Sequence, residues 1–107
     1  MKVEIVNCSE ISFQDDAFTD LNHLEDITVI QSDLLEAPDI ENVCRHLWIL
    51  NLRMNYISDI PDDYFTTCSM LKWLDLRENN LTHLPKIEPL AKSLKINITL
   101  SRTWMKC

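Results

Sequence analysis

The chain has 107 residues, an apolar fraction of 46% and a formal net charge of −7 at pH 7. This length allows one small domain, and the charge argues against a nucleic-acid partner because no basic stripe could neutralise phosphates. There is no run of about 18 apolar residues, so we expect no direct membrane insertion, and the first residues, "MKVEIVNCSE", lack the apolar core of a signal peptide.

One pattern of apolar and polar positions recurs about every 23 or 24 residues along the chain. The three clearest copies begin at Leu24, Leu47 and Leu71, and each follows L-x-x-L-x-L-x-x-N-x-L with related residues at some positions. In the less regular last copy, Ile98 and Leu100 fill the strand positions. We therefore expect about 4.5 repeats, starting near residues 1, 24, 47, 71 and 95, in a single domain over residues 1–107.

Each repeat is expected to contribute one short strand to a parallel sheet, because its central apolar positions alternate. The strands are predicted near residues 3–6, 27–30, 50–53, 74–77 and 98–101. Between them we expect short helical or irregular segments, with Phe18 and Phe65 pointing into the core. Carboxylates precede both phenylalanines, and we interpret them as solvated residues at the start of a helical turn rather than as a calcium site: Asp15, Asp16, Asp62 and Asp63.

One polar position in each repeat is predicted to be structural. It follows the strand, where the chain turns inward and buries backbone groups that need partners. Its occupants are small and can donate a hydrogen bond: Cys8, Ser32, Asn55, Asn79 and Thr103. Glycine is absent from the chain, so left-handed turns must use other residues, and we expect Asn55, Asn79 and Asn80 to adopt them.

These positions, together with "IPDDYF" at 60–65 and "LTHLP" at 81–85, resemble the typical leucine-rich repeats of animal extracellular proteins, such as Toll-like receptor and Slit ectodomains. The resemblance covers nearly the whole chain. It implies an α/β fold, a right-handed solenoid shaped like a horseshoe with a concave parallel β-sheet. It also implies a scaffold that often binds proteins on the concave sheet and that is not itself an enzyme.

The end of the chain, "LSRTWMKC", resembles the entry to the cysteine-rich cap of such extracellular repeats. Thr103 replaces the usual asparagine, Trp104 comes one residue early, and Cys107 alone represents the cysteines of the cap. We therefore expect either a fragment of a longer repeat array or a divergent member of the family.

Strand alternation predicts which side chains point away from the core on the concave face. Tryptophan and arginine are the types most enriched at binding hot spots, and clustered exposed apolar residues often mark an interface. The alternative is that other parts of the chain cover this face or that the face simply tolerates apolar residues. The candidate protein-binding residues are Ile30, Ile49, Asn51, Arg53, Met54, Trp73, Asp75 and Arg77.

Cysteines and glycosylation sequons bear on the cellular compartment. Cys44 and Cys68 occupy equivalent positions in successive repeats, where they could fill the core as thiols or lie within disulfide reach. Sequons begin at Asn7, Asn80 and Asn97, and their glycosylation would require a secretory route.

Catalytic and metal-binding motifs are missing from the sequence. There is no nucleophile elbow or phosphate loop, and Cys44-Arg45-His46 lacks a second ligand pair for zinc. His23 and His46 occupy equivalent positions and are interpreted as solvated residues rather than as a pH sensor. We therefore expect no enzyme, no cofactor and no metal.

The sequence thus favours an extracellular module, secreted or part of a receptor, that binds a protein ligand or co-receptor in a process such as immune recognition. A cytosolic repeat adaptor or regulatory subunit is one alternative, which free thiols would favour. A purely structural segment of a longer solenoid is the other. The ligand and the oligomeric state do not follow from the sequence.

Overall fold

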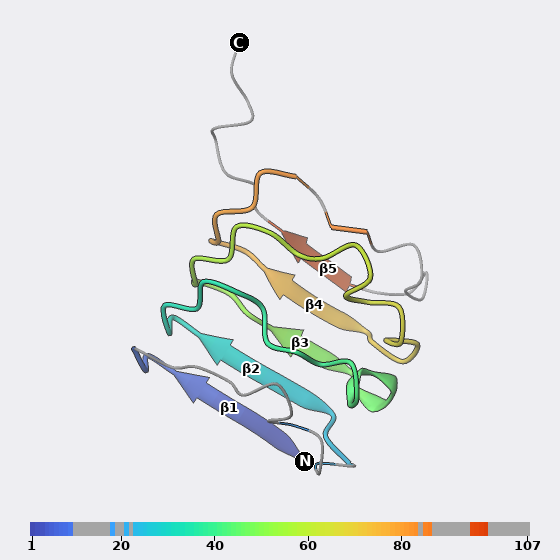
Figure 1. Cartoon of the computed structure of the whole chain (residues 1–107). Coiled ribbons are helices and arrows are strands. Elements are labelled where there is room, and N and C mark those ends of the chain that lie inside the picture. Colours follow the sequence, from blue (N-terminus) through green and yellow to red (C-terminus); the bar gives the residue numbers. More distant parts are fainter. Residues whose placement is uncertain (10–17, 19–20, 22, 84, 87–94, 99–107) are drawn as a thin grey trace.

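The computed structural model describes residues 1–9, 18, 21, 23–83, 85–86 and 95–98, the last four as backbone only. Five strands form one parallel sheet in which the spatial order equals the chain order (Figure 1). Each repeat therefore adds one strand beside the previous one, as in a leucine-rich repeat solenoid. The strands are β1 (Lys2–Val6), β2 (Asp26–Ile30), β3 (Ile49–Asn51), β4 (Trp73–Leu76) and β5 (Lys95–Ile98).

The first four strands lie where the periodicity predicts them, but β5 does not. Its predicted position was 98–101, whereas Ile96 pairs with Leu74 and Ile98 pairs with Leu76. Ile96, Ile98 and Leu100 alternate along the chain, so a shift of two residues keeps the same face inward and periodicity cannot distinguish the two registers. Continuing the observed register would move the polar column from Thr103 to a position two residues earlier, and both positions lie outside the described residues.

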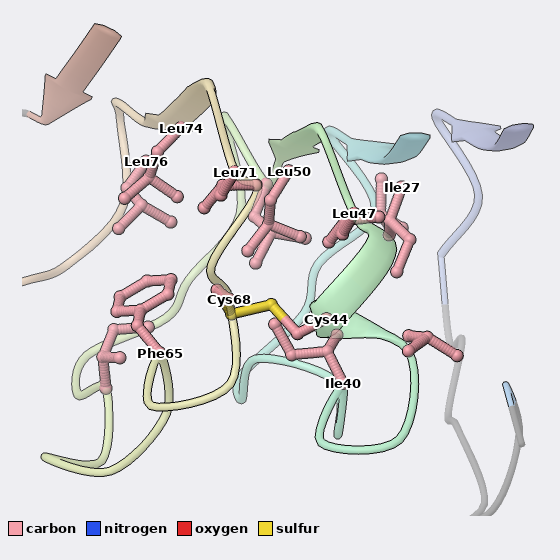
Figure 2. Close-up of a cluster of buried hydrophobic side chains, with 14 of the residues drawn as sticks. Ile27, Ile40, Cys44, Leu47, Leu50, Phe65, Cys68, Leu71, Leu74 and Leu76 are labelled. Atoms are coloured by element: carbon pink, nitrogen blue, oxygen red, sulfur yellow. A yellow bond between two sulfur atoms is a disulfide. The ribbon is translucent and has the colours of Figure 1, made fainter. Parts of the chain in front are cut away.

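The core lies between the sheet and the segments that return from one strand to the next (Figure 2). Phe18 and Phe65 are buried from the return side, as predicted. Val3 and Ile5 are only half-buried, because β1 is the edge strand of the described sheet. The leucine positions of the three middle repeats are fully buried: Leu24, Ile27, Val29, Leu47, Leu50, Leu52, Leu71, Leu74 and Leu76.

A disulfide joins two neighbouring coils on the return side of the core (Figure 2). Cys44 opens the 3-10 helix η1 (Cys44–His46), and its Cα lies 4.6 Å from that of Cys68. Both residues are buried. Of the two states that the sequence allows for these cysteines, the structure therefore has the bridge.

Asn55 in the polar column links two neighbouring coils through its side-chain amide. The Oδ1 atom accepts hydrogen bonds from the backbone N–H groups of Ser32 (3.0 Å) and Leu34 (3.1 Å). The Nδ2 atom donates to the carbonyls of Val29 (2.8 Å) and Leu52 (3.0 Å). These backbone groups have no partner in the sheet ladder at this turn, so one buried side chain satisfies them.

Asn79 repeats this arrangement one coil later. Its Oδ1 accepts from the backbone N–H of Ile57 (3.0 Å), and its Nδ2 donates to the carbonyls of Leu52 (2.9 Å) and Leu76 (3.2 Å).

At the other end of the column, the contacts are fewer. The Ser32 hydroxyl donates to the carbonyl of Ile30 (2.9 Å) and accepts from the N–H of Cys8 (3.3 Å), whose thiol is exposed and free. Cys8 is thus a peripheral member of the column, because no described coil precedes β1.

The prediction of which residues adopt the left-handed conformation was wrong. Asn55, Asn79 and Asn80 do not have positive φ angles, and the residue immediately before the polar column adopts that conformation instead. A left-handed residue turns the backbone after the strand, and the residue that follows it in the three middle repeats is buried. These residues, with their φ angles, are Asn7 (59°), Gln31 (53°), Met54 (61°) and Glu78 (59°), and Asp33 (60°) also has a positive φ.

Candidate protein-binding face

The face of the sheet that points away from the core, called the open face here, carries three rows of side chains. The first two rows follow from the strand register, and the third continues just beyond β3 and β4, where Gln31 N–H bonds to the Arg53 carbonyl (3.2 Å) and Met54 N–H to the Arg77 carbonyl (2.9 Å). The first row is Lys2, Asp26, Ile49 and Trp73, the second is Glu4, Thr28, Asn51 and Asp75, and the third is Val6, Ile30, Arg53 and Arg77.

Apolar side chains gather on the open face where β2, β3 and β4 lie together. Trp73 is 37% exposed and stands next to Ile49 in the first row. Ile30, which belongs to the third row, is half-buried. Met54, which directly follows the third-row residue Arg53 in the chain, is also half-buried. Large apolar groups partly open to water on a sheet face are the type of surface that a partner can cover. We call Ile30, Ile49, Met54 and Trp73 the apolar patch.

Asp75, which the sequence placed among the binding residues, is nearly inaccessible in the structure. It is 1% exposed, and the Arg77 guanidinium covers it with two hydrogen bonds, Nε to Oδ1 (3.1 Å) and Nη2 to Oδ2 (2.9 Å). This paired geometry suits a buried carboxylate. The hydrogen bond to Asp75 raises the pKa of the Arg77 guanidinium above its usual value. Asp75 therefore positions Arg77 and cannot itself touch a partner.

A group of charged side chains lies at the β1 end of the open face. Lys2 Nζ lies 2.8 Å from Glu4 Oε2 and 3.8 Å from Asp26 Oδ2. The hydrogen bond that the Lys2 ammonium donates to Glu4 raises the pKa of Lys2. Thr28 in the second row is buried, and its hydroxyl donates a hydrogen bond to Asp26 Oδ1 (2.6 Å). Since exposed ion pairs contribute little to stability, this end of the face is polar without being strongly ordered by charge.

The residue pattern did not predict a second apolar area at the edge where the chain enters the strands. Trp48 and Met70 are 44% and 42% exposed there. They line a hollow with His23, Glu25 and His46, and the Lys72 ammonium lies 5.4 Å from the Trp48 ring centroid. The signal in the sequence is a tryptophan directly after a core leucine, a position that the strand alternation does not include. We call this area the entry rim.

Comparison with known families settles the class of the chain. A family model described as "Leucine rich repeat" matches residues 45–98, half of the chain. The chain belongs to the leucine-rich repeat family. Repeats of this family are protein-interaction modules in general, and the one-sided parallel sheet with few helical residues fits their solenoid architecture. No solved structure gives a significant match to the chain.

Two of the three sequon asparagines of this leucine-rich repeat protein have described side chains. Asn7 and Asn80 are both exposed, so a glycan on either would extend into solvent. Asn97 lies in β5, in register with Asp75 and thus at a second-row position of the open face. The Asn97 side chain lies outside the described part of the structure, so the effect of a glycan there on access to the open face stays a prediction.

The described residues show neither a metal cluster nor a membrane-spanning helix. Within the part of the chain that the structure describes, no group of three or more His, Cys, Asp or Glu residues could hold a metal ion. Asp62 pairs with Lys86 (3.6 Å) and His83 with Asp59 (3.2 Å), while Asp15 and Asp16 lie outside the described residues. No helix among the described residues is long and apolar enough to cross a membrane.

Proposed function

We propose that this leucine-rich repeat protein is a non-catalytic module that binds a protein ligand or co-receptor on the open face of its sheet. The observation that carries the proposal is the apolar patch over β2 to β4, which stands beside Arg53 in the third row. A large aromatic residue and an arginine, surrounded by half-buried aliphatic groups, have the composition of a binding hot spot.

The structural alternative is a segment whose sheet edges only stack on further repeats. Stacking of repeats uses the strand edges and the ends of the core. It leaves the open face uncovered, so it gives no reason for Ile49 and Trp73 to be apolar. The apolar patch therefore favours partner binding, with stacking as an additional property of the ends.

We further propose that the protein works in an oxidising extracytosolic compartment, as a secreted module or a receptor ectodomain. The buried Cys44–Cys68 bridge supports this, since disulfides rarely persist in the cytosol. The exposed sequon asparagines Asn7 and Asn80 are compatible with glycosylation on that route. A role in immune recognition is the finer form of the proposal, and it rests on the resemblance to receptor ectodomains.

The binding proposal is tested by screening the oxidised chain against arrayed secreted proteins and receptor ectodomains, with an array of cytosolic proteins in parallel. A partner found in this way is then measured against Trp73→Ala and against Trp48→Ala, a control that removes a slightly more exposed tryptophan from the entry rim. We expect Trp73→Ala to weaken binding by about 2 kcal/mol, or about 30-fold, and Trp48→Ala to have little effect. The opposite ranking would place the site on the entry rim.

The compartment proposal is tested by expression through a eukaryotic secretory pathway. Non-reducing mass spectrometry should recover a peptide containing the Cys44–Cys68 bridge, and glycosidase treatment should shift the mass of the protein. The matched variants Asn7→Gln and Asn80→Gln assign the shift to a site. Retention in the cell with free thiols at both positions would favour the cytosolic adaptor instead.

A further inference from the structure

Two arginines occupy equivalent positions on adjacent coils but have different surroundings. Arg77 has an internal counterion, because Asp75 lies two residues before it on the same face and binds its guanidinium through both carboxylate oxygens. The residue in register with Asp75 on the preceding coil is Asn51. Its Oδ1 accepts only the backbone N–H of Arg53 (3.2 Å) among the described hydrogen bonds. The segments LNLR (50–53) and LDLR (74–77) thus differ at their second residue. The aspartate in the second segment neutralises its arginine, whereas the asparagine in the first cannot.

Arg53 is left without a counterion as a result. Its guanidinium forms no ion pair with any residue that the structure describes. Its Nε atom is buried and has no hydrogen-bond acceptor in the described part of the chain. A buried N–H group without an acceptor is unfavourable, and the half-exposed side chain can still be reached from solvent. Among the side-chain nitrogens of Arg53, only Nε is buried without a partner, so an acceptor brought by a protein ligand would bind the two Nη groups.

The surroundings of Arg53 define which acceptor fits. Ile30 precedes it in the third row, and Met54 follows it in the chain, so a ligand there is partly shielded from water. A carboxylate accepts two parallel hydrogen bonds from a guanidinium, as Asp75 does from Arg77. With a net charge of −7, the chain repels highly charged anions such as phosphate groups or sulfated chains more strongly than a single carboxylate.

We propose that Arg53 binds the side-chain carboxylate of one Asp or Glu in the protein partner, flanked by apolar residues that cover the apolar patch. This inference rests on the proposed function, because it names the chemistry of the partner at the same face. In the free protein, Asn51 in the second row provides no carboxylate for Arg53, so the guanidinium can bind one from a partner. In the next coil, Asp75 already binds the guanidinium of Arg77.

The test uses random peptides displayed on phage as fusions without a free C-terminus, selected on the oxidised full chain. We expect enriched peptides to contain one Asp or Glu among apolar residues. Synthetic versions should bind at least about tenfold more weakly to Arg53→Gln. Replacing the peptide acid by its amide should cause a similar loss on the parent chain and no further loss on Arg53→Gln. Arg45→Gln, at an exposed arginine in η1, is the matched control and should leave affinity unchanged.

Asn51→Asp gives an independent arm, because it supplies Arg53 with the internal carboxylate that Arg77 already has. The Asn51→Asp variant should lower the affinity for acidic peptides by a similar factor, although it leaves Arg53 in place. Its folding is checked by circular dichroism, since it places a second carboxylate in register with Asp75.

Different failures have different meanings. Enriched peptides that depend on Trp73 but contain no acid, or that bind Arg53→Gln as well as the parent, would overturn the carboxylate inference and leave the proposed function standing. Peptides insensitive to both Trp73→Ala and Arg53→Gln, or no enrichment at all, would contradict both proposals.

Discussion

Replacing Asn55 by alanine should be among the most destabilising single changes in the polar column. The variant removes the acceptor of two buried N–H groups, those of Ser32 and Leu34, and the donor to the Val29 carbonyl. The Leu52 carbonyl loses one of its two donors and keeps Asn79 Nδ2. Each buried group left without a partner costs about 1–3 kcal/mol. Because water can enter part of the space, we expect a loss of about 3–5 kcal/mol, less than the sum of the separate costs.

The comparison with Asn79→Ala sharpens the test. Asn79 accepts from one backbone N–H, that of Ile57, where Asn55 accepts from two. Asn79→Ala should therefore cost less, about 1–3 kcal/mol, and Asn79→Ser less again because Ser32 already serves in the column. The free energy of unfolding is measured by urea titration with far-UV circular dichroism, and exposed Asn80→Ala is the control. Asn55→Ala within about 1 kcal/mol of the parent would refute the bonding pattern.

Three further predictions concern the turn, the bridge and the half-buried phenol of Tyr64. Met54→Asn should raise the free energy of unfolding by about 0.5–1 kcal/mol, because asparagine tolerates the left-handed conformation better than methionine; urea titration should show no change or a loss if this φ angle is not adopted in solution. Reducing the bridge between Cys44 and Cys68, which are separated by 24 positions in the sequence, should cost about 3 kcal/mol, seen as a lower urea midpoint with reductant. Burial, followed by the charge of Asp39, raises the pKa of Tyr64, whose hydroxyl donates to the Pro38 carbonyl. The folded chain then keeps a proton that the unfolded chain releases, so stability should be intact below about pH 10 and fall above it. Urea titrations between about pH 8 and 11 should show that Tyr64→Phe removes the fall and that exposed Tyr56→Phe does not.

Periodicity was sufficient to predict the first four strands and the core beneath them from the sequence. Leu50 and Leu74 pair in register because each repeat must place its apolar face inward, and a one-residue slip would expose it. The same argument fails for β5, where Ile96, Ile98 and Leu100 satisfy two registers equally. Alignment also brought Cys44 and Cys68 onto adjacent coils, but thiols and a bridge fit that position equally well, so the redox state needed the structure.

The candidate site could be predicted only in outline. Alternation identified the open face and Trp73, because it depends on direction alone. It could not show that Asp75 is covered by Arg77, since burial on this face depends on side-chain pairing rather than on spacing. It also missed Trp48, which lies between η1 and β3, outside the alternating segment.

The position of the left-handed residues could not be predicted from spacing either, because it depends on hydrogen bonds of buried side chains. We expected asparagines to take that conformation because they tolerate it best. The hydrogen bonds that Asn55 and Asn79 make to the backbone instead fix them one residue later, and residues such as Met54 and Glu78 must accept the strained position. The needs of the buried amide thus override the local preference.

The most direct test of partner binding on the open face is the response of the individual tryptophan side chains. A chain labelled with ¹⁵N is titrated with a partner from the ectodomain screen or a selected peptide, and the indole N–H signals are followed by NMR, with Trp73→Phe and Trp48→Phe for assignment. We predict that the Trp73 signal shifts with the occupancy of the site while the Trp48 signal stays in place. A saturable shift of Trp48 alone, with Trp73 unmoved, would contradict the account and place binding on the entry rim.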